Sequence, residues 1–155
     1  MALSLHPNIS VVGAEAAIDF YVAAFGATLV TAVRAGGLVV HSDLTLGDTG
    51  FTVAEAMPTF GSVAPTVDGP THASFTIEVE DTDAAFARAV AAGAVAVEEP
   101  NDGFHGGRIA TVRCPFGHRW FLNQTVEVLD QAELQRRVDA WAAQSPGTTT
   151  VPDPA

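Results

Sequence analysis

The pattern of apolar and polar positions in the first half of the chain predicts one helix followed by several strands. Residues 3–12 alternate between the two classes and predict an opening strand with His6 and Asn8 on one face. Residues 14–25 carry apolar side chains at helical spacing, and Gly26 is a natural stop. Glycine-rich turns then separate strands expected at about 28–34, 37–46 and 50–56. The order is therefore βαβββ.

The second half repeats this order after a connecting loop. Residues 58–70 hold three prolines and two glycines without any period, which marks a loop. Residues 71–79 alternate, with His72 and Ser74 opposite Phe75, and predict a strand. A helix is expected over 83–92, and further strands at about 94–99, 107–113 and 118–124.

A short internal repeat supports this duplication, because the segment from Ala17 to Ala27 is echoed 67 residues later by Ala84 to Ala94. Near the end of the chain, Asp130 is the expected N-cap of a last helix. The predicted fold class is α+β, with two βαβββ modules forming a curved, cup-shaped mixed sheet, helices outside, and a C-terminal helix. The expected divisions of this single domain are a first module at 1–57, a loop at 58–70, a second module at 71–126, a helix at 127–144 and a flexible tail at 145–155.

Composition narrows the possible functions. The chain has 18 acidic and 7 basic residues, a net charge of −11, so nucleic acid and anionic membranes are poor partners. Every basic residue is an arginine, and the lack of lysine excludes Schiff-base and P-loop chemistry. The one cysteine, Cys114, has no intrachain partner, which fits a reducing cytoplasm. With no leader or membrane-spanning pattern, we expect a cytoplasmic protein.

The predicted helix-free faces of the two modules carry polar side chains mixed with aromatic ones. A solvated sheet face and the lining of a ligand cup are equally good interpretations of the alternation alone. The duplication favours the cup, because two curled modules side by side enclose what each alone would expose. The residues expected on this face are His6, Asn8, Ser10, Glu55, His72, Ser74, Thr76, Arg119 and Asn123, with Phe51, Val53 and Phe121 among them.

Three motifs resemble the glyoxalase/bleomycin-resistance/extradiol-dioxygenase superfamily, also called vicinal oxygen chelate. They are Ala17-Ile18-Asp19-Phe20-Tyr21 with Phe25-Gly26-Ala27, the helix at 83–94, and Pro115-Phe116-Gly117-His118-Arg119-Trp120. The segment Phe104-His105-Gly106-Gly107-Arg108 is similar to the Phe-Trp-Gly-Asp-Arg segment typical of the PhnB-like subgroup. The resemblance covers about residues 3–142 and implies paired βαβββ modules, a cup-shaped site and usually a homodimer.

The resemblance also implies where a metal would bind. His6 and His72 stand at the ligand positions on the first strand of each module, and Glu55 falls near another. Phe121 stands at the fourth position, where its side chain cannot coordinate. The remaining three could hold Fe, Zn, Ni or Mn in an open site. We favour a pocket with no metal or other cofactor, in which they form hydrogen bonds and Phe121 stacks on a flat ligand; His72 could also be purely structural.

The favoured function is therefore a small-molecule-binding protein that sequesters an aromatic or cationic natural product, such as an antibiotic. The alternative is a metal-dependent lyase, isomerase or dioxygenase, and a weaker one is a metal-free isomerase or hydratase with Glu55 or a histidine as base. No catalytic residue is assigned, because nothing in the sequence indicates a nucleophile with its base. The expected ligand-binding residues are His6, Asn8, Phe51, Glu55, His72, Ser74, Phe104, His105, Arg108, Phe121 and Asn123.

Overall fold

The structure is a computed structural model that describes residues 3–144. Its first half is one four-stranded sheet with a helix on one face, in the strand order β1-β4-β3-β2. Strand β1 pairs with β4 in parallel, and the other neighbours are antiparallel. The elements are β1 (Asn8–Val11), α1 (Ala14–Phe25), β2 (Thr28–Ala35), β3 (Leu38–Leu46) and β4 (Thr49–Glu55).

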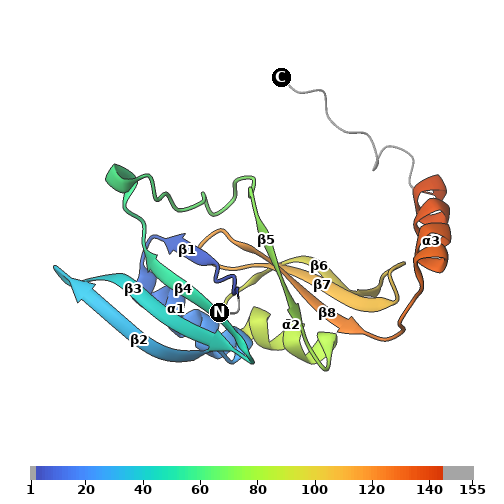
Figure 1. Ribbon diagram of the computed structural model, residues 1–155, viewed down its shortest axis with the longest axis horizontal. Helices are drawn as coiled ribbons and strands as arrows, with labels where there is room; N and C mark the ends of the chain where they lie inside the picture. Colours follow the sequence, from blue (N-terminus) through green and yellow to red (C-terminus); the bar gives the residue numbers. More distant parts are fainter. Residues whose placement is uncertain (1–2, 145–155) are drawn as a thin grey trace, which may run out of the picture.

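The second half repeats this topology, with the strand order β5-β8-β7-β6 and β5 parallel to β8. A short 3-10 helix, η1 (Pro58–Phe60), lies in the linker between the two halves. The elements are β5 (Ser74–Glu78), α2 (Thr82–Ala91), β6 (Val95–Asp102), β7 (Gly107–Arg113), β8 (Arg119–Thr125) and the C-terminal α3 (Gln131–Gln144). Figure 1 shows the two sheets side by side, with α3 beyond the far end of the second. The α+β class and the duplicated βαβββ order are confirmed.

Local sequence explains where the helices begin and end. Asp81 caps α2, since its carboxylate accepts a hydrogen bond from the Ala84 amide at 2.9 Å. Gly26 ends α1 with φ of 74°, a left-handed conformation that favours glycine. Asp130 accepts from the Glu133 amide at 2.8 Å, as expected of the cap of α3. No helix in the described part of the chain has the length and apolar character to cross a bilayer. The tail predicted at 145–155 lies outside the described residues.

The core lies where α1 packs against α2 and joins the two modules. Trp120 of β8 is 4% exposed and contacts aromatic rings from both halves. Its ring centroid lies 4.9 Å from that of Phe25 and 4.8 Å from that of Phe75. Tyr21 is fully buried beside it, with a centroid distance of 5.4 Å. These rings give the two modules one continuous core, because burying them stabilises both sheets at once.

Two sequence predictions need correction in the first module. The opening strand is limited to Asn8–Val11, so His6 precedes it; Pro7 has no amide hydrogen to donate to a longer ladder. Phe51 and Val53 are 7% and 0% exposed and belong to the core on the side of α1, not to the helix-free face. The parallel register pairs Asn8 with Thr52, so the residues between the two apolar ones occupy that face.

Candidate functional site

The face of the second sheet that lies away from α2, here called the open face, brings together most of the predicted second-module residues. Strand register sets Phe121 of β8 beside Thr76 of β5. One step along, Asn123 lies between Glu78 of β5 and Ile109 of β7. The alternate side chains of the same strands pack toward α2, as the alternation predicts. Residues far apart in the sequence therefore form one polar and aromatic surface.

A hydrogen-bonded network fixes the polar half of this face. Asn123 is 8% exposed, and its Nδ2 donates to both carboxylate oxygens of Glu78 at 2.9 Å. The Oδ1 of Asn123 lies 3.0 Å from Nε2 of His105. Because an ionised carboxylate can only accept, the Asn123 NH₂ group must face Glu78, and Oδ1 must accept from His105. His105 therefore donates from Nε2, so when its ring carries a single proton, Nδ1 is the free acceptor.

Two glycines make room for the imidazole of His105. A Cβ at residue 107 would lie 2.7 Å from its Nε2 and 2.6 Å from Oδ1 of Asn123. A Cβ at residue 103 would lie 2.5 Å from its Nδ1. Any larger residue at either position would displace the ring or the amide, since real Cβ contacts are longer than this. The glycines at 103 and 107 therefore leave the space that the His105 ring occupies.

Phe121 and Arg119 form the aromatic and cationic part of the open face. The guanidinium carbon of Arg119 lies 4.9 Å from the Phe121 ring centroid, a cation–π contact. The Nε atom of Arg119 is buried, and among residues 3–144 it has no hydrogen-bond partner. A buried donor without an acceptor is costly, so a ligand that supplies one would be favoured here. The face can therefore hold a flat ring and polar groups together.

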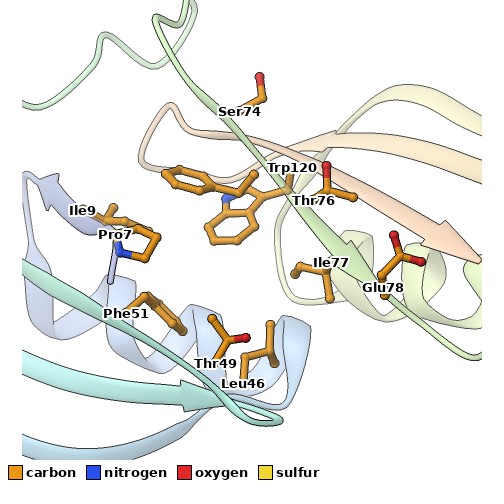
Figure 2. A pocket seen from close by; sticks show the side chains of 11 residues that line it. Pro7, Ile9, Leu46, Thr49, Phe51, Ser74, Thr76, Ile77, Glu78 and Trp120 are labelled. Atoms are coloured by element: carbon orange, nitrogen blue, oxygen red, sulfur yellow. The ribbon is translucent and has the colours of Figure 1, made fainter. Parts of the chain in front are cut away.

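A cavity of about 450 Å³ lies between the two modules, beside their shared core, and adjoins the open face across β5. The first module contributes Ile9, Leu46 and Phe51 to its wall, and Trp120 forms part of the other side. Figure 2 shows Ser74, Thr76 and Glu78 following β5 along this cavity. Its volume falls within the range of small-molecule sites, and its lining is mainly apolar with a few polar groups.

The structure does not assemble the predicted first-module residues into this site. Glu55 points to the start of α1, where its carboxylate oxygens accept from the amides of Gly13 and Ala14, each at 2.9 Å. The carboxylate is therefore used as a helix cap. His6 lies beside Gly50 on the other sheet, and Asn8 accepts from Thr52 Oγ1 at 2.5 Å. Phe51 remains relevant only as a wall of the cavity between the modules.

Two predicted residues of the second module also lie elsewhere. His72 precedes β5 and lines a separate recess with His118, next to the linker. Arg108 points toward α2, where it forms ion pairs with Asp83 and with Asp102, the latter at 3.0 Å. Those two carboxylates raise the pKa of the Arg108 guanidinium. The motif that placed Arg108 in the site therefore supports the α2 side of the sheet instead.

The predicted metal ligands are not gathered within one chain. Among the described residues, no three side chains of His, Cys, Asp or Glu come together as a metal site. His6 lies on the first sheet, Glu55 caps α1, and His72 lines the recess beside the linker. Within one chain, the described residues thus do not form the divalent-metal site that the resemblance allows.

Two residues of the site were missed by the sequence reasoning. Glu78 shares the alternation of Ser74 and Thr76, so its place on the open face was readable from the pattern. Its bond to Asn123 was not, because that depends on the register of β5 against β8. Trp141 of α3 lies with its ring centroid 5.3 Å from that of Phe104. The apolar stripe on α3 does not indicate which end of the sheet the helix packs against.

Two modules of equal topology, each with a helix on one face of its sheet, define a paired βαβββ fold. The chain belongs to the Glyoxalase/Bleomycin resistance protein/Dioxygenase superfamily, which it matches over residues 4–122. The predicted resemblance to this superfamily is confirmed. An uncharacterised protein of Mycobacterium bovis is 38% identical over 138 residues, which cover 85% of this chain and 90% of the relative.

Solved structures show the same fold. TioX from Micromonospora sp. ML1 is 27% identical with a TM-score of 0.58, over 79% of this chain and 99% of that one. A gene product of Arabidopsis thaliana is 26% identical with a TM-score of 0.64, over 79% and 98% of the two chains. The fosfomycin resistance protein FosX of Listeria monocytogenes has a TM-score of 0.63 at 12% identity, covering 86% of this chain and 98% of FosX, which is a likeness of fold alone.

Proposed function

We propose that this protein is a small-molecule-binding protein of the cytoplasm that sequesters an aromatic or cationic natural product, such as an antibiotic, without a metal cofactor. The observation that carries the proposal is the prearranged open face. There a buried Asn123 is hydrogen-bonded at both ends next to the Phe121 ring. Groups held in place before binding lose little entropy when a ligand arrives, which favours affinity.

Charge supports a cationic ligand. The net charge of −11 gives the protein a negative field that attracts cations and repels anions. Sequestration requires only tight, reversible binding, so no catalytic group is needed. Because the fold hosts many chemistries, the proposal depends on the residues of the site and not on the solved structures that share the fold.

We also propose that the protein is a homodimer. In both sheets the face away from the helix is left uncovered by residues 3–144, and the outer strands expose apolar side chains such as Val30, Val33 and Val95. A second copy that covers these faces would remove apolar surface from water and enclose a bound ligand. Light scattering on the purified protein would give twice the chain mass; the mass of a single chain would contradict the dimer.

Membership of the PhnB-like subgroup is likewise a proposal, based on the Phe104–Arg108 segment.

Calorimetric titration with bleomycin, ethidium and berberine tests the binding role, because all three combine flat rings with positive charge. At least one should bind saturably and be recovered unchanged by mass spectrometry. Asn123→Leu should weaken that binding, whereas His41→Gln, on the other sheet, should not. Absence of binding by all three, or chemical conversion of a bound one, would overturn the proposal. A stoichiometric metal in the purified protein that His72→Ala removes would favour the metal-dependent alternative.

A further inference from the structure

A recess of about 300 Å³ lies where the turn between β6 and β7 meets α3. Phe104, Ile109 and Trp141 supply its apolar lining. Trp141 is 38% exposed, so its indole retains a surface that a ligand can contact. Figure 1 shows α3 at this end of the second sheet, remote from the first module. Since the superfamily match ends at residue 122, the helix that closes the recess lies outside the matched region.

The polar groups around the recess favour a positive charge. Glu98 accepts hydrogen bonds from Asn101 at 3.0 Å and Thr111 at 3.4 Å, both of which are neutral donors. Asp102 also lines the recess and is paired with Arg108. Glu98 forms no ion pair with any described residue, so its carboxylate adds a negative charge to the rim of the recess that no cation offsets.

The network on the open face supplies an acceptor at the same place. Its hydrogen bonds place an N–H of His105 on Nε2, so a ring with a single proton presents Nδ1 as an acceptor. The edge of the ring that carries Nδ1 lies over Gly103, which lines the recess. Within residues 3–144, no donor is bonded to this nitrogen. A neutral imidazole nitrogen fixed in this way is a good acceptor for an ammonium group.

From these observations we infer that the recess binds the protonated amine of an arylalkylamine, with His105 Nδ1 accepting a hydrogen bond and Trp141 contacting the aromatic ring. The inference rests on the proposed function and names its ligand class more narrowly. Glu78 and Asn123 are positioning residues, because they act on the ligand only through the tautomer of His105. The face of the Trp141 indole contacts the ligand's cation and the aromatic ring attached to that cation.

Three matched probes separate charge from hydrogen bonding. Phenethylamine carries both a charge and N–H donors, phenethyltrimethylammonium keeps only the charge, and phenethyl alcohol keeps only a donor. In an NMR titration of the full chain, phenethylamine should bind most tightly and shift the ring signals of His105 and the indole N–H of Trp141. Loss of one charge-assisted hydrogen bond predicts about tenfold weaker binding of the trimethyl analogue. Equal affinity for all three probes would overturn the inference.

Variants then locate the contacts. His105→Gln should weaken phenethylamine about tenfold but leave the trimethyl analogue nearly unchanged. Trp141→Ala should weaken both cations by about two- to fivefold. His41→Gln, at an exposed histidine of the first module, is the matched control and should change neither. If both site variants bind phenethylamine as the wild type does, the recess is not its site.

The tautomer of His105 can be measured directly by NMR. A purely structural role of the network would not predict that a change of tautomer alters ligand binding. Long-range proton–nitrogen correlations of the His105 ring should show the proton on Nε2 in the wild type. Glu78→Gln lets the Asn123 amide turn over, because glutamine can donate as well as accept, and should give a mixture of tautomers and weaker phenethylamine binding. Exposed Glu78 should tolerate this change. An Nδ1–H tautomer in the wild type would refute the assigned acceptor.

The outcomes distinguish this inference from the broader proposal. If bleomycin, ethidium or berberine binds but phenethylamine does not perturb His105 or Trp141, sequestration stands and the recess is rejected. If phenethylamine binds as described while none of the three larger molecules does, the recess stands and the proposed ligand class for the cup is rejected. If nothing binds, both are rejected.

Discussion

The two modules share a topology but differ in what they bury and what they leave open. In the first module α1 buries seven residues, whereas α2 of the second buries three. The face of the first sheet that lies away from α1, here called the first open face, carries exposed local pairs, such as Thr31 with Asp43 at 2.6 Å. The second carries the buried Asn123 with its network. Duplication has thus produced one module that anchors the core and one that presents a prearranged polar face.

The largest expected effect is a loss of stability when Trp120, in the core, is replaced. Trp141, at the exposed recess, is the comparison. Trp120→Ala should lower the free energy of unfolding by about 3–5 kcal/mol, because Trp120 joins the aromatic rings of both modules. Trp141→Ala, at the exposed recess, should cost less than about 1 kcal/mol. Urea denaturation followed by circular dichroism measures both. Equal losses would mean that Trp120 does not join the two modules.

A second change tests whether Glu55 belongs to the scaffold. Glu55→Ala removes the acceptor of two amides at the start of α1 and should cost about 1–2 kcal/mol. Glu15→Ala, which breaks only an exposed pair with Arg34, is the matched control and should cost less than about 1 kcal/mol. Ligand affinity should be unaffected by both. Lost affinity with unchanged stability would mean that Glu55 contacts the ligand and does not stabilise α1.

Alkaline titration tests the burial of Tyr21 in the shared core. Desolvation, together with the neighbouring Cys114, raises the pKa of Tyr21 well above 10.0. The unfolded chain then releases this proton before the folded one, so stability should fall as pH rises above about 10. Tyr21→Phe should remove that part of the fall. The sequence has one tyrosine, so tyrosinate absorbance reports this group alone; ionisation of the native protein near pH 10 would contradict its burial.

A smaller pH effect is expected at the turn before β8. Burial lowers the pKa of His118 below its usual 6.5. The unfolded chain therefore binds this proton more readily, and stability should fall as pH drops below about 6.5. His118→Gln should reduce that slope in urea denaturation series, and His41→Gln, on the exposed face of the first module, serves as the control. An unchanged slope in the His118 variant would show that this group stays solvated.

Much of the fold was predictable because it depends on local patterns. The alternation at 71–79 and the helical spacing at 14–25 reflect which side chains must be buried, and these recur in both modules. The candidate site was less predictable from the sequence than the fold. Phe51 and Glu55 were set on the wrong face, although Phe51 and Val53 alternate with Thr52 and so mark the buried side of β4. Glu55 lies on that same side, where its carboxylate caps α1. Arg108 was placed by a motif, and a motif does not reveal the carboxylates of Asp83 and Asp102 across α2 and β6.

We propose that the second module carries the ligand. The most direct test is chemical-shift mapping of the full-length protein with bleomycin, ethidium or berberine, whichever binds. The largest shifts should fall on His105, Phe121 and Asn123, with small changes on β2 and β3. Shifts concentrated on His6, His41 and Asp43 of the first open face, with Asn123 and His105 unmoved, would contradict it.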